Sequence, residues 1–99
     1  MGLDNIWIEP KGRILPPMTF EPPLQLWVGM LTDPACSFRG KCYASYVEAV
    51  TGTDIYENLD NAKVLEVASG LEGFVVHARD LARMFRAFGD AGYHLEAWF

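Results

Sequence analysis

The chain has 99 residues, of which 51% are hydrophobic and 13% aromatic, and eight Lys and Arg against thirteen Asp and Glu give a formal net charge of −5. This length excludes a second domain, and the apolar content is sufficient for one buried core that folds without disulfides or a structural metal. The acidic balance disfavours a nucleic-acid partner, because phosphate contacts are made mostly by Lys and Arg, and it makes a basic partner electrostatically easier.

No stretch approaches the roughly 20 apolar residues of a membrane span, and the first residues lack the charged and apolar regions of a signal peptide. We therefore expect a cytoplasmic protein with no membrane partner. In that compartment Cys36 and Cys42 are expected to be reduced thiols, at least one of them packed in the core. A disulfide across their short loop and a metal site with His77 and His94 are the alternatives.

Both ends of the sequence read as strands. Ile6–Glu9 and Tyr93–Phe99 alternate in the two-residue period of a pleated sheet, and a small domain would place them side by side. All six prolines fall within residues 1–35, which excludes a helix there and favours extended chain with short edge strands. Lys11-Gly12 predicts a turn, and Leu24–Val28 predicts a second strand.

The proline pairs of this region, Pro16-Pro17 and Pro22-Pro23, allow two interpretations. A polyproline II segment would be a ligand for an aromatic groove on another protein. The apolar residues between the pairs favour packing against the domain's own body instead.

Three helices are predicted to follow. The first begins with Ser37 as N-cap and ends at Gly52, the second begins at Asp60 and ends around Gly70 to Gly73, and the third covers Arg79–Phe88. Apolar residues repeat at helical spacing in each: Tyr43, Tyr46, Val47 and Val50; Val64, Val67, Ala68 and Leu71; Leu81, Met84, Phe85 and Phe88. Phe74–His77 is ambiguous between a connector, a strand and a first helical turn.

The order of these elements predicts an α+β fold. A small, mostly antiparallel sheet that includes the N- and C-terminal strands is expected to pack on about three helices. The single domain, residues 1–99, divides into a proline-rich extended region at 1–35, a helical region at 37–92 and a closing strand at 93–99.

The strongest candidate for a small-molecule site is Ser37, Arg39, Gly40 and Lys41. At a helix N-terminus, free backbone N–H groups and the helix dipole favour an anion, Arg39 adds a two-pronged donor, and Gly40 permits close approach. The alternative is an ordinary capped helix start with two solvated basic residues.

A row of arginines marks the third helix. Arg79, Arg83 and Arg86 are spaced by four and three residues, on the side of the helix away from its apolar stripe. This pattern is typical of a solvated face supported by Asp80 and Asp90. The functional alternative is a docking ridge for an acidic protein surface, or for the acidic face of a second copy.

Aromatic residues on the end strands suggest an interface. Ile6 and Ile8 point to one side of the sheet and Trp7 to the other, while His94 shares a side of its strand with Trp98. Both faces therefore carry bulky groups. The face away from the helices is either covered by the proline-rich segment, with Phe20 and Trp27, or exposed as an interface centred on Trp7 and Trp98.

No sequence motif of an enzyme is present, and we predict no catalytic residue, cofactor or metal ligand. The sequence favours a small acidic cytoplasmic interaction domain that binds a protein partner or forms a homodimer, with an inhibitor or adaptor as a special case. The interface candidates are Trp7, Trp98, His94, Arg79, Arg83 and Arg86. The alternative is a phosphate- or carboxylate-binding protein, or a minor enzyme, that uses Ser37–Lys41.

Overall fold

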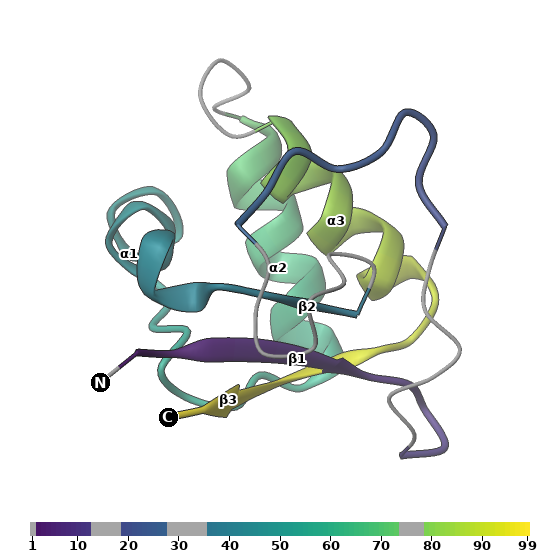
Figure 1. Cartoon of the computed structure of the whole chain (residues 1–99), viewed down its shortest axis with the longest axis horizontal. Helices are drawn as coiled ribbons and strands as arrows, with labels where there is room; N and C mark the ends of the chain where they lie inside the picture. Colours follow the sequence, from purple (N-terminus) through teal and green to yellow (C-terminus); the bar gives the residue numbers. More distant parts are fainter. Residues whose placement is uncertain (1, 13–18, 28–35, 74–78) are drawn as a thin grey trace.

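The computed structural model describes residues 2–12, 19–27, 36–73 and 79–99. In chain order its elements are β1 (Asp4–Ile8), β2 (Ser37–Phe38), the single 3₁₀ turn η1 (Gly40–Cys42), α1 (Ala44–Thr51), α2 (Asn61–Glu72), α3 (Arg79–Asp90) and β3 (His94–Trp98) (Figure 1). This arrangement confirms the predicted α+β class. None of the helices within these residues has the length and apolar character needed to cross a bilayer.

The sheet places the two ends of the chain side by side. Its strand order is β2-β1-β3 and both pairings are antiparallel. Asp4 lies opposite Trp98 at one end of the long pairing and Ile8 lies opposite His94 at the other (Figure 1). The prediction that the terminal strands pair is therefore confirmed.

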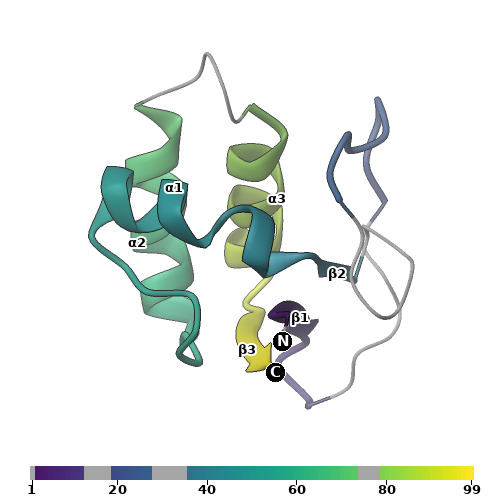
Figure 2. The same cartoon turned by 60° about the vertical axis from the view of Figure 1, so that its left-hand side comes forward.

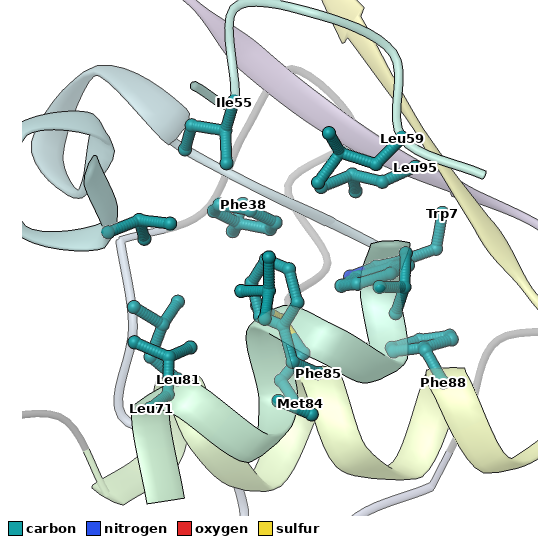
Figure 3. Close-up of a cluster of buried hydrophobic side chains, with 14 of the residues drawn as sticks. Trp7, Phe38, Ile55, Leu59, Leu71, Leu81, Met84, Phe85, Phe88 and Leu95 are labelled. Carbon is teal, nitrogen blue, oxygen red and sulfur yellow. The ribbon is translucent and has the colours of Figure 1, made fainter. Parts of the chain in front are cut away.

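The helices lie against one face of the sheet (Figure 2). Trp7 of β1 faces them: its ring is stacked on Phe88 with centroids 4.5 Å apart and meets Phe85 edge-on at 5.0 Å (Figure 3). Phe38 of β2 packs against Trp7 and Phe85 in the same cluster. Burial of several such aromatic and aliphatic side chains, each stabilising by about 1.5–3 kcal/mol, holds the two layers together.

Local signals explain two of the helix boundaries. Asp60 caps α2, because its carboxylate accepts a hydrogen bond from the backbone N–H of Lys63 at 2.9 Å. α1 ends at Gly52, which adopts a left-handed conformation with φ of 75° that other residues rarely take. The N-cap prediction for Ser37 is wrong, because Ser37 lies in β2 and α1 begins only at Ala44.

The second strand was also predicted in the wrong place. Residues 24–27 form no strand, and Val28 lies outside the described residues. Residues 19–27, which we call the strap, run beside α3: the N–H of Gln25 donates to Asp80 Oδ2 at 2.8 Å, and Arg83 donates to the carbonyl of Pro22 at 2.6 Å. Leu24 of the strap is buried. The strap thus packs on the domain's own body, as the apolar residues between the prolines predicted. Phe74–His77 lies outside the described residues.

Candidate functional site

The region predicted to bind an anion does not have the expected backbone. The N–H groups of Arg39, Lys41, Cys42 and Tyr43 all donate to backbone carbonyls, at 2.9 to 3.0 Å. The side chain of Ser37 is fully buried. No array of free N–H groups at a helix start therefore supports the anion prediction.

The Arg39 side chain of this region is engaged within the fold, whereas Ser37 Oγ has no hydrogen-bond partner among the described residues and Lys41 is exposed. Arg39 Nε lies 3.9 Å from Asp4 Oδ1, and the Arg39 guanidinium covers Gly2. Gly40 is buried against Asn5. The glycine at position 40 is thus required for packing, so its presence is not an indication of a ligand. Anion binding at these residues stays a prediction that no contact favours.

Trp7 and Trp98 lie on opposite faces of the sheet. Antiparallel register pairs Trp7 with Leu95 on the face that packs on the helices, and pairs Trp98 with Asp4 on the other face. Trp7 is fully buried, whereas Trp98 is 40% exposed. The predicted joint patch of Trp7 and Trp98 is therefore wrong: Trp7 belongs to the core, and only Trp98 is available to a partner.

The outer face of β3 carries a row of three polar and aromatic side chains. His94 Nε2 lies 3.3 Å from Glu96 Oε2, and the indole N–H of Trp98 donates to Glu96 Oε1 at 3.2 Å. The carboxylate of Glu96 thus bridges its two neighbours in the row and restrains the orientation of the indole. His94, predicted as an interface residue, is partly exposed beside Trp98.

The arginine row of α3 is not a free ridge. Arg86 donates to both carboxylate oxygens of Glu72 in α2, at 2.8 and 2.9 Å, and to Asp90 at 3.3 Å. Its hydrogen bonds lower the pKa of Glu72 and raise the pKa of Arg86. Arg86 therefore fastens α3 to α2.

Arg83 and Asp80 fasten α3 to the strap. Arg83 donates one hydrogen bond to Asp80 Oδ1 at 2.7 Å and another to the carbonyl of Pro22. Partial burial raises the pKa of Asp80, but the N–H of Gln25 and the Arg83 guanidinium outweigh it, so the pKa lies below its ordinary value. Arg79 is exposed, whereas Arg83 and Arg86 are partly exposed. All three arginines line a shallow depression of about 380 Å³ between α3 and the strap, but Arg83 and Arg86 are engaged by the carboxylates of Asp80 and Glu72.

An exposed aromatic surface lies at the end of β3. The rings of Tyr56 and Phe99 meet with centroids 5.8 Å apart, and they are 43% and 72% exposed. Trp98 adjoins Phe99 in the chain, but its side chain belongs to the outer face of β3 with His94 and Glu96. We call Tyr56 and Phe99 the aromatic surface. Among the described residues, Trp27 is another large exposed hydrophobic side chain. Its carbonyl accepts a hydrogen bond from the N–H of Arg39, which follows β2, so Trp27 lies at the edge of the sheet opposite β3.

Sequence reasoning missed Tyr56, which stands in the connection between α1 and α2. That connection, residues 52–60, is fixed at several points. Leu59 exchanges two backbone hydrogen bonds with Leu95 at 2.8 and 2.9 Å, and Asn58 accepts from the N–H of Ala97. Ile55 is fully buried. The sequence did offer one indication, because the apolar residues Ile55 and Leu59 on either side of Tyr56 indicate a loop that is anchored on the core. Tyr56 between them is therefore expected to be held firmly.

Metal and redox chemistry would need clustered ligand side chains or paired cysteines. Within the described residues, no group of three or more His, Cys, Asp or Glu side chains could hold a metal ion. Cys36 is buried, Cys42 is exposed, and the two are not joined by a disulfide. His77 lies outside the described residues.

No protein-family model, curated protein or solved structure matches this chain.

Proposed function

We propose that this chain is a protein-interaction domain without catalytic activity, and that it binds through the aromatic surface of Tyr56 and Phe99. The single observation that carries this proposal is the contact between these two exposed aromatic rings, at the end of β3. Isolated apolar residues on a surface are ordinary, but contiguous ones indicate a binding surface. Tyr and Trp are also the residues most enriched at the centre of protein interfaces.

The framework under this surface supports the proposal. Tyr56 is held between the buried Ile55 and the bridge of Leu59 to Leu95. Little conformational entropy would be lost when such preorganised side chains are covered by a partner. An inhibitor or adaptor functions by binding of this kind. We propose a cytoplasmic location, in keeping with the absence of a disulfide between Cys36 and Cys42.

The proposal is tested with a displayed library of random peptides selected against the folded chain. Peptides should bind the wild type and lose at least about tenfold in affinity, or 1.4 kcal/mol, on Tyr56→Ser or Phe99→Ser. Trp27→Ser is the matched control, because it removes an equally exposed aromatic side chain at the opposite sheet edge. Selected peptides that are indifferent to Tyr56→Ser and Phe99→Ser but sensitive to Trp27→Ser would overturn the assignment.

Self-association is tested separately. The solution mass is measured by light scattering over a series of protein concentrations. A dimer that dissociates on Phe99→Ser would identify the partner as a second copy of the chain, and a concentration-independent monomer would identify it as a different protein.

A further inference from the structure

Three carboxylates lie in the segment that carries Tyr56 of the aromatic surface. Asp54, Glu57 and Asp60 lie in the connection between α1 and α2, and all three residues are exposed. Asp54 accepts the N–H of Tyr56 and Asp60 accepts the N–H of Lys63, each with one oxygen. Among the described residues, none of these three carboxylates is in an ion pair.

The cations of the fold are, by contrast, largely committed to ion pairs. Arg83 and Arg86 are held by the carboxylates of Asp80 and Glu72 at 2.7 and 2.8 Å. Lys63, which borders the connection, lies 3.2 Å from Glu66 Oε2. Lys63 also lines the same shallow depression as the three carboxylates of the connection, so three carboxylates there outnumber one cation, which is itself paired with Glu66.

Two shallow depressions meet along residues 58–60. One, of about 330 Å³, is lined by Asp54, Glu57 and Asp60 among others. The other, of about 620 Å³, is lined by Asp60 and, on β3, by His94 and Glu96. A chain segment lying across residues 58–60 would reach both. We call this the acidic groove.

Acidic groups and aromatic rings lie next to each other here. Tyr56 stands in the sequence between Asp54 and Glu57, and its ring meets that of Phe99. A Lys or Arg head group is attracted to carboxylates and also to an aromatic face within about 6 Å, while its aliphatic stem packs on apolar surface. A cationic side chain satisfies both features of this surface at once.

We propose that the partner of this domain is a Lys- and Arg-rich segment of another protein, bound across the acidic groove and the aromatic surface. This inference rests on the proposed function and names the chemistry of its partner. A second copy of the chain fits less well, because a two-fold interface on this surface would bring Asp54 and Glu57 against their own copies. The acidic groove likewise repels nucleic acid.

The test measures binding of a short peptide of alternating Lys and Ala, with a Glu-for-Lys peptide as comparison, by fluorescence anisotropy. The Lys peptide should bind and the Glu peptide should not. The affinity should fall steeply between about 0.01 M and 1 M salt, because the Debye length shrinks from about 30 Å to about 3 Å.

Matched variants locate the binding site. Glu57→Gln should lower the affinity for the Lys peptide about threefold to tenfold, which corresponds to a loss of roughly 0.6–1.4 kcal/mol in binding free energy. Glu21→Gln is the matched control: it removes one exposed carboxylate from the strap and gives the chain the same net charge as Glu57→Gln. It should leave the affinity for the Lys peptide unchanged. Equal losses in both variants would show attraction by net charge alone and would overturn the proposed groove.

The same library selection separates this inference from the proposed function. Peptides that need Tyr56 and Phe99 but are neutral or acidic would overturn the cationic partner and leave the interaction function standing. Failure of both the library and the Lys peptide to bind would overturn both proposals. Basic selected peptides that lose affinity on Glu57→Gln and on Tyr56→Ser would support both.

Discussion

Replacing Gly40 by alanine is expected to destabilise the fold strongly. A Cβ at this position would overlap Asn5 Oδ1 and lie 2.9 Å from Leu3 Cδ2. Asn5 cannot turn away freely, since it is fully buried and its Nδ2 donates to the carbonyl of Ile55 at 2.8 Å. The variant must either strain the packing or break this buried hydrogen bond.

The magnitude follows from those two alternatives. Overpacking costs about 1–3 kcal/mol, and a buried polar group left without its partner costs about 1–3 kcal/mol. We therefore expect Gly40→Ala to lower the free energy of unfolding by about 2–4 kcal/mol, which for a domain of this size lowers Tm by at least about 8 °C. Urea denaturation followed by far-ultraviolet circular dichroism measures the loss.

Two further variants make the reasoning refutable. Gly73→Ala is the control, because its Cβ would lie an ordinary 3.5 Å from the nearest atom, the carbonyl oxygen of Gly70, and its cost should stay within about 0.5 kcal/mol. In an Asn5→Ala background the overlap with Asn5 is gone, so Gly40→Ala should cost less than about 1 kcal/mol. The same cost for Gly40→Ala in both backgrounds would refute the explanation.

Three other predictions concern stability. Trp7→Ser should destabilise the fold by at least about 3 kcal/mol because it empties the core, whereas Trp98→Ser should change the free energy of unfolding by less than about 1 kcal/mol; the same urea titration compares them. Asn61 Nδ2 donates to the carbonyls of Gly89 and Tyr93, both at 2.9 Å, so Asn61→Asp, which cannot donate, should lower Tm more than the exposed control Asn58→Asp. The lowered pKa values of Glu72 and Asp80 mean that their stabilisation is complete above their ordinary values of 4.5 and 3.8 and is lost as the pH falls through the folded-state values. In the double variant Glu72→Gln, Asp80→Asn, the urea midpoint should therefore decrease less than in the wild type as the pH is lowered.

Strongly periodic segments could be predicted from the sequence. The strands β1 and β3, the cap at Asp60 and the apolar stripe of α3 depend on neighbours in the chain, and all of them are present in the structure. Features that depend on distant partners were missed. β2 has only two residues, too few to show a period, whereas the strap residues alternate but hydrogen-bond to α3 through Asp80 and Arg83.

The candidate interface shows the same distinction. Alternation correctly assigned Trp7 and Trp98 to sides of their own strands, but which sides coincide is decided by the antiparallel register. The arginine spacing correctly indicated one face of α3. It could not reveal that Glu72, from another helix, would hold Arg86.

The three tryptophans lie in three different environments, and each is a natural optical probe. Trp7 is fully buried, Trp98 is 40% exposed and Trp27 is 70% exposed. Since indole emission depends on contact with water, variants that keep one tryptophan and replace the other two with phenylalanine would separate the signal of the core, of the β3 end and of the strap. A quencher dissolved in the buffer would then reach Trp27 most readily and Trp7 least.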